Sequence, residues 1–154
     1  MSKHFLIYNF RSSKAAFIEH ICGTKQASID CGIPLDDKYS INGKINDLKL
    51  FKKIIFKRNK VWATKQLFEE EIDKEINIYE KIYQIAKNLV DTIAITKIMT
   101  ILEIMSKPTK LGYKKCLVFD RTPITVIYLE NIIKEIIKKD KLNYTTISII
   151  GENK

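Results

Sequence analysis

Few residues in this 154-residue sequence could carry out chemistry, and those few lie far apart in the chain. Neither of its two histidines, His4 and His20, has a candidate nucleophile or carboxylate at a useful spacing, so both are expected to be structural. The three cysteines, Cys22, Cys31 and Cys116, form no CxxC pair that could begin a zinc site. We therefore expect buried thiols, no metal and no cofactor.

One short cluster, formed by Tyr113, Lys114 and Lys115, could offer a phenol and two cations to a phosphodiester. The same residues fit the start of a strand with solvated lysines, and we favour that interpretation. The signatures GxSxG, HExxH and the phosphate-binding GxxxxGK[ST] do not occur in the sequence. By residue chemistry alone the chain is predicted to be a binding or scaffold protein.

The charge balance favours a polyanionic partner. Lysine and arginine together number 27 against 18 acidic residues, which gives a net charge of +9. Neutralising a phosphate releases counterions, so the chain could be a stand-alone RNA- or DNA-binding module or a ribosome-associated protein. The alternative is that the lysines are merely solvated. The candidate RNA contacts are Lys114, Lys115, Arg121, Lys138, Lys139 and Lys141.

The expected location follows from two patterns that the sequence lacks. It contains no run of about 20 apolar residues and no apolar segment typical of a signal peptide. We expect a soluble, cytoplasmic protein that does not associate with a membrane.

The strongest local pattern covers residues 114–150, which are predicted to form a strand, a turn, a helix and a second strand. Residues 116–119 are an apolar run, and residues 143–150 alternate and are rich in threonine and isoleucine. Between them, Thr122 can cap a helix with Pro123 at its first position, and apolar residues then recur at helical spacing. This predicts an α/β unit, which other elements must cover on one side.

The other elements follow from the same signals. Residues 3–10 have the composition of a strand, residues 12–21 and 46–57 suit helices, and residues 29–40 are expected to be irregular. The helical period from residue 64 to residue 89 is unusually long, so we place a domain boundary within residues 73–77. Residues 93–105 fit a strand by composition and a helix by spacing, and this choice stays open. We predict an α+β fold with two domains, residues 1–74 and 75–154.

The order of these elements resembles that of the archaeal tRNA-splicing endonucleases, the tRNA-intron lyases. The segments FIEHICGTK, LKLFKKIIFKRNK and ATKQLFEEE are similar to helices and turns of that family's small first domain. The segments NIYEKIYQIAKNL, CLVF and ISII are similar to a helix and two strands of its nuclease domain. The resemblance implies a small N-terminal α/β domain and a C-terminal nuclease-like domain with a mixed sheet flanked by helices.

Catalytic members of that family cleave RNA without a metal, using a tyrosine, a histidine and a lysine. The matching region of this chain lies near Met105, Tyr113 and Lys141, and no histidine follows His20. The resemblance therefore implies a non-catalytic, structural subunit that is inactive alone. The complete enzyme would remove introns from pre-tRNA at bulge–helix–bulge motifs.

The implied partners are pre-tRNA and a catalytic endonuclease subunit, with which the chain would form an (αβ)₂ heterotetramer. The predicted last strand lies at a sheet edge, where unpaired N–H and C=O groups could bind a partner strand. After it, Glu152 could meet a basic pocket of the neighbour, as the family's acidic loop does. The candidate interface residues are Tyr144, Ile147, Ile149 and Glu152.

Overall fold

Helices make up most of the chain that the structure describes. The structure is a computed structural model, and it describes residues 12–34, 40–57, 65–106 and 115–150. Of these residues 73% lie in six helices, and none lies in a β-strand. The predicted α+β fold with a mixed sheet is therefore wrong for the described part of the chain. The helices are α2 (Lys14–Cys22), α3 (Thr24–Cys31), α4 (Lys44–Lys57), α5 (Lys65–Asn88), α6 (Thr92–Ser106) and α7 (Pro123–Lys139).

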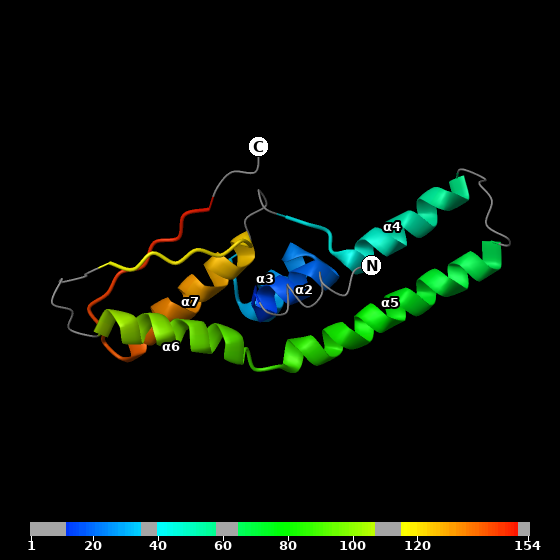
Figure 1. Cartoon of the computed structure of the whole chain (residues 1–154). Helices are drawn as coiled ribbons and strands as arrows, with labels where there is room; N and C mark the ends of the chain where they lie inside the picture. The colour runs from blue at the N-terminus through cyan, green and yellow to red at the C-terminus, as the bar shows by residue number, and fades with distance from the viewer. Residues whose placement is uncertain (1–11, 35–39, 58–64, 107–114, 151–154) are drawn as a thin grey trace.

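The two strands predicted on either side of α7 are extended segments that pair with no other described residue as a strand (Figure 1). Residues 115–120 lead to the N-terminus of α7, and residues 142–150 leave its C-terminus. In the described part of the chain, no backbone–backbone hydrogen bond involves residues 115–120 or 143–149. An alternating sequence favours an extended backbone, but a sheet also requires a neighbouring strand, which the described residues do not supply. The strand predicted at residues 3–10 lies outside the described residues.

Residues 93–105, which fitted either a strand or a helix, belong to helix α6. Ala94, Ile98 and Leu102 recur every four residues, and the first two are fully buried in a cluster with Leu129 of α7. In a strand Thr96 and Thr100 would share this buried face, but both are exposed, so packing follows the helical period despite the β-branched composition. The short helix α3 covers part of the segment expected to be irregular.

The core is built around α2, which lies in the middle of the molecule (Figure 1). Ala15, Ile18 and Ile21 of α2 are fully buried. They belong to one cluster with Tyr79 of α5 and Ile124 of α7. Because α2 contacts α3, α4, α5 and α7, one short helix joins distant parts of the chain.

The long helices form two pairs on either side of α2 (Figure 1). α4 and α5 lie against each other and extend to one end of the molecule, and α6 and α7 pack together at the other end. The ring centroids of Phe51 on α4 and Phe68 on α5 are 5.9 Å apart. The boundary predicted between residues 74 and 75 falls inside α5, which is continuous over its 24 residues.

Helix α7 begins where the sequence predicted, with Thr122 as its N-cap and Pro123 in its first turn. Ile133 and Ile136 pack against the buried cluster of α6 and α7, and no described strand covers them. None of the described helices combines the length and the apolar character needed to cross a membrane.

Candidate functional site

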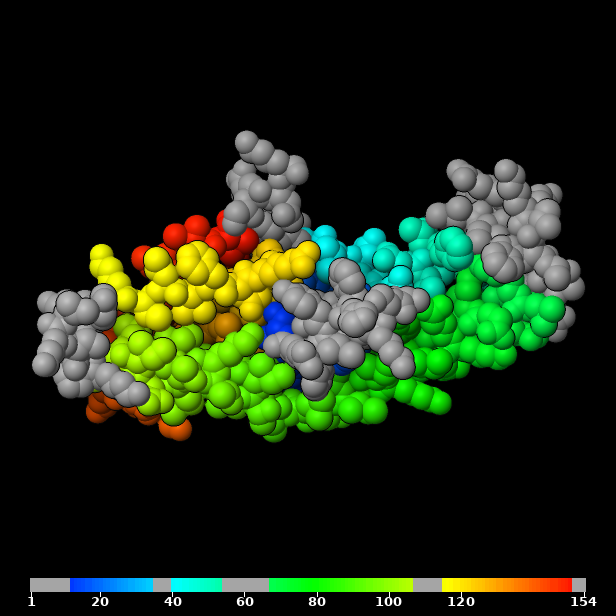
Figure 2. All heavy atoms as spheres, viewed as in Figure 1, coloured from blue at the N-terminus to red at the C-terminus, as the bar shows by residue number. Residues whose placement is uncertain are grey.

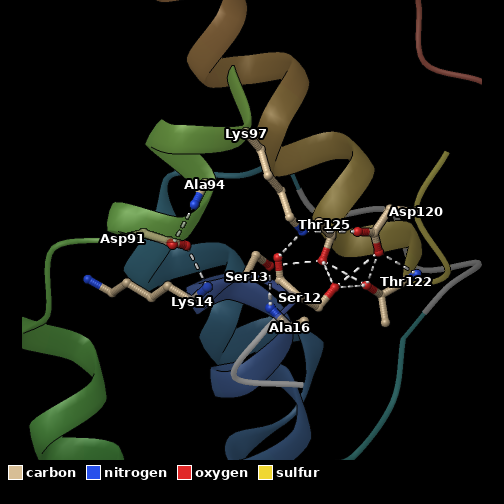
Figure 3. A network of polar contacts seen from close by, with 10 residues as sticks. All are labelled: Ser12, Ser13, Lys14, Ala16, Asp91, Ala94, Lys97, Asp120, Thr122 and Thr125. Carbon is tan, nitrogen blue, oxygen red and sulfur yellow. Dashed lines mark hydrogen bonds and ion pairs between the residues drawn. The ribbon is translucent and has the colours of Figure 1, made fainter. Parts of the chain in front are cut away.

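A group of polar side chains lies where α2, α6 and α7 begin (Figure 3). The Ser12 hydroxyl donates to Oδ1 of Asp120 over 3.0 Å, and its oxygen lies 3.1 Å from the Thr125 hydroxyl. The Ser13 hydroxyl lies 2.8 Å from the same Thr125 oxygen, and the Thr122 hydroxyl donates to Asp120 over 2.8 Å. We call this group the polar cluster, and its members are Ser12, Ser13, Lys97, Asp120, Thr122 and Thr125.

Lys97 supplies the positive charge of the polar cluster. Its Nζ donates to the backbone carbonyl of Ser12 over 2.7 Å and lies 3.5 Å from Oδ2 of Asp120. Burial alone would raise the pKa of the Asp120 carboxyl. Hydrogen bonds from Thr122 and Ser12, together with the charge of Lys97, outweigh burial and lower that pKa below its usual range. The carboxyl group of Asp120 is therefore ionised at neutral pH.

Backbone caps connect the polar cluster to the helix ends. The Ser13 hydroxyl accepts from the Ala16 N–H over 3.0 Å and so caps α2. Next to the cluster, Asp91 accepts from the Lys14 N–H over 2.6 Å and from the Ala94 N–H over 2.9 Å. One carboxylate thus binds the N-termini of both α2 and α6, where the helix dipole favours negative charge.

The polar cluster is arranged for structure and not for catalysis. A serine nucleophile needs a neighbouring base that can take its proton, but the carboxylate to which Ser12 donates, Asp120, has a lowered pKa and is therefore a weak base. The hydroxyls of the cluster hydrogen-bond mainly to one another and to Asp120. Nowhere in the described ranges do three or more histidine, cysteine or acidic side chains converge as metal ligands.

Replacing Asp120 with asparagine is expected to lower the free energy of unfolding by about 1–3 kcal/mol at about pH 7. The reason is that Oδ1 accepts from Ser12 and Thr122 while Oδ2 accepts from Lys97, so an amide NH₂ group would replace an acceptor on one side and the charge beside Lys97 would be lost. Because the pKa of Asp120 is lowered in the folded protein, this stabilisation is complete above about pH 4, the usual carboxyl pKa, and is lost as the pH falls through the folded pKa. The difference between wild type and variant should therefore shrink in acid.

Urea unfolding at several pH values measures both effects. The matched control is Asp73→Asn, because Asp73 forms an exposed ion pair with Lys52 at 2.7 Å and this change should cost less than about 1 kcal/mol. If Asp120→Asn cost no more than the control at neutral pH, the hydrogen bonds of Asp120 would not be stabilising.

Arg121 lies far from three of the other candidate RNA contacts. Lys115, Arg121, Lys138, Lys139 and Lys141 are exposed. Arg121 precedes α7, whereas Lys138, Lys139 and Lys141 lie at its other end, and a helix of 17 residues separates its two ends by about 25 Å. Lys114 lies outside the described residues.

Two of the three positions matched to the catalytic triad lie in the described part of the chain. Met105 is half-buried near the end of α6, and Lys141 is exposed with a φ of 52°. The Tyr144 hydroxyl donates a long hydrogen bond of 3.4 Å to the Met105 carbonyl. The structure thus brings the end of α6 near the segment that follows Lys141. Tyr113 lies outside the described residues.

Four large apolar side chains stand almost fully in solvent. Leu117 and Phe119 are 83% and 88% exposed, and Ile147 and Ile149 are 86% and 88% exposed. We call these four residues the exposed apolar set. Ile147 and Ile149 were predicted to be interface residues, but Leu117 and Phe119 were predicted to lie in a strand of the sheet. Their exposure could not be foreseen, because it depends on what lies beside the segment.

Residues 142–150 lie against α7 along one face only. Their exposure alternates from residue to residue, and Tyr144 and Ser148 are on the half-buried side. The Ser148 hydroxyl donates to Oε2 of Glu130 over 2.6 Å, and Lys134 forms an ion pair with Glu130 at 2.9 Å. Burial would raise the pKa of Glu130, but the hydrogen bonds from Ser148 and Lys134 lower it. The last interface candidate, Glu152, lies outside the described residues.

The three cysteines have no bonded partner. Cys22 and Cys31 are half-buried, and burial raises the pKa of each thiol to about 11, so both are protonated and unreactive at neutral pH. Cys116 is exposed, contrary to the expectation of three buried thiols.

Any function must therefore be inferred from these residues and their geometry, because no protein-family model, no curated protein and no solved structure matches this chain.

Proposed function

We propose that the chain is a non-catalytic assembly subunit, which binds an extended segment of a partner protein along residues 142–150. The observation that carries the proposal is the exposed apolar set, whose four side chains are all more than four-fifths exposed. Each isoleucine or phenylalanine that a partner covered would stabilise the complex by about 1.5–3 kcal/mol.

The backbone of residues 143–149 supports the same proposal. It has no backbone–backbone hydrogen bond within the described ranges. Apart from the Ser148 N–H, which donates to the Glu130 carboxylate, its N–H and C=O groups could therefore pair with a partner strand. Contacts on the other face, from Ser148 to Glu130 and from Tyr144 to Met105, hold the segment against the helices. A segment that is already extended and supported loses less conformational entropy when a strand binds.

The positive charges near residues 115–120 and 142–150 favour a partner strand that carries acidic residues. Residues 115–120 begin with exposed Lys115 and are followed by exposed Arg121, and residues 142–150 follow exposed Lys138, Lys139 and Lys141. A partner strand with apolar side chains on one face and acidic residues at its ends would therefore complement this surface in both shape and charge.

The specific form of this proposal is the tRNA-splicing role, in which the partner is a catalytic endonuclease subunit acting on pre-tRNA. It rests on the sequence resemblance and on the lack of a histidine after His20. The described helices do not reproduce the family's sheet, so the fold of the described residues does not contribute to this form of the proposal. Co-expression with such a catalytic subunit should yield a heterotetramer that cleaves intron-containing pre-tRNA. Failure of the two chains to assemble would contradict the splicing role and leave strand binding to be tested by itself.

Strand binding is expected to be lost in the double variant Ile147→Asp with Ile149→Asp. The probe is a labelled peptide in which valine alternates with acidic residues, and fluorescence anisotropy measures its binding to the full chain. The variant should weaken binding at least about tenfold, because it removes two apolar contacts and adds two like charges. Ile78→Asp is the matched control, since Ile78 is 56% exposed on α5, and it should bind as the wild type does. A scrambled peptide that bound equally well, or a double variant that bound normally, would refute the proposal.

A further inference from the structure

An open groove of about 780 Å³ lies between α4 and α5 and reaches down to α2 and α3. Cys22 and Ile45 provide apolar surface at its base, and α5 contributes Asn77, Lys81 and Gln84 to one wall. The volume falls within the range of roughly 300–1,000 Å³ that is typical of ligand sites. None of the groove residues belongs to the polar cluster or to the exposed apolar set, so the groove is a separate surface.

The α5 wall presents three polar groups that the rest of the described chain does not engage. Asn77, Lys81 and Gln84 follow one another at spacings of four and three residues, so they share one face of the helix and span about 10 Å. All three are exposed, and among the described residues their side chains make no hydrogen bond or ion pair. Across the groove, Lys49 of α4 lies 3.9 Å from Glu80, so Lys81 provides the excess positive charge.

We propose that this groove binds single-stranded nucleic acid, with a phosphate at Lys81 and base edges at Asn77 and Gln84. A carboxamide both donates and accepts hydrogen bonds, as the edge of a base does, whereas the ionised side chains of an acidic peptide only accept. Unpaired bases present these edges to a protein, and the apolar base of the groove can take the faces of their rings. The net charge of +9 attracts a polyanion to the chain as a whole.

The test uses the full chain and a labelled RNA strand of about 12 nucleotides, a length within the usual site sizes for single strands. Fluorescence anisotropy at several salt concentrations should show that Asn77→Ala combined with Gln84→Ala weakens binding at least about fivefold without changing the salt dependence. Lys81→Ala should reduce the slope of log affinity against log salt by about 0.7.

Lys74→Ala is the matched control on the same helix. Lys74 forms an ion pair with Glu71 at 2.7 Å and lies outside the groove. Lys74→Ala should therefore change the affinity less than the Asn77 and Gln84 double variant does, and the salt slope less than Lys81→Ala does. Circular dichroism should show unchanged helix content in every variant, because alanine favours the helix.

Three results would overturn the proposal. The first is wild-type affinity in the Asn77 and Gln84 double variant, and the second is binding of a blunt duplex of the same sequence as tightly as the single strand. The third is displacement of the RNA by polyglutamate at an equal concentration of charge, which would show that the groove responds to charge and not to bases.

Discussion

Replacing Gly43 with alanine is expected to lower the free energy of unfolding by more than about 3 kcal/mol. Gly43 has a φ of +75°, a conformation in which a side chain is strained. An added Cβ would also overlap the backbone nitrogen of Gly23 and the backbone of Cys22. Because these atoms belong to the main chain at the end of α2, they cannot rotate away, and the start of α4 must separate from α2.

Thermal and urea unfolding of the Gly43→Ala variant measure this loss. Gly32→Ala is the control, because Gly32 has a similar φ of +63° but no atom within 4 Å of its added Cβ. That variant should lose only about 1 kcal/mol, the cost of the backbone conformation alone. Equal losses in the two variants would show that the close approach of α2 and α4 contributes nothing.

Truncating Ile18 to alanine is expected to cost about 2–5 kcal/mol. Ile18 lies in the middle of α2 with no exposed surface, in the cluster to which α2, α4, α5 and α7 all contribute. Removing its outer atoms leaves a cavity that several helices would have to move together to fill, so relaxation is limited.

The comparison for Ile18→Ala is Ile29→Ala, because Ile29 is 66% exposed on α3 and its truncation should cost less than about 1 kcal/mol. Both changes remove the same atoms from a helix, so the difference between them in urea unfolding reports burial. Similar losses at the two positions would mean that α2 is not the centre of the core.

The helices that the sequence predicted best are those with clear local signals. Thr122 and Pro123 fix the start of α7, and the apolar residues of α4 recur at the helical period, so both could be predicted from neighbouring residues. α6 could not be decided, because its composition favours a strand and only the burial of Ala94 and Ile98 against α7 selects the helix.

The sheet was mispredicted for a related reason. Residues 142–150 do alternate between exposed and half-buried positions, as their sequence pattern indicates. Whether an alternating segment joins a sheet depends on a second backbone far away in the sequence, and no local pattern contains that information.

The polar cluster could not be predicted from the sequence for the same reason. Ser13 and Thr122 could each be recognised as a possible helix cap, and both precede helices in the structure. In the structure Ser12 contacts Thr122 and Ser13 contacts Thr125, so two segments more than 100 residues apart in the sequence meet. Nothing in the sequence of either segment predicts this contact. The lysine that completes the cluster, Lys97, stands in the helix whose identity was left open.

The long sequence separation within the polar cluster has a consequence for folding and motion. Contacts such as Ser12 to Asp120, which are 108 residues apart, are expected to form late in folding, because closing a long loop costs conformational entropy. Ala94, Ile98 and Leu129 make up a small apolar cluster of their own, separate from the one around α2. Because Ile124 of α7 also belongs to the cluster around α2, opening of α6 and α7 must break that contact together with the hydrogen bonds of the polar cluster. A partner bound along residues 142–150 would favour the closed form and so lengthen the lifetime of the native state.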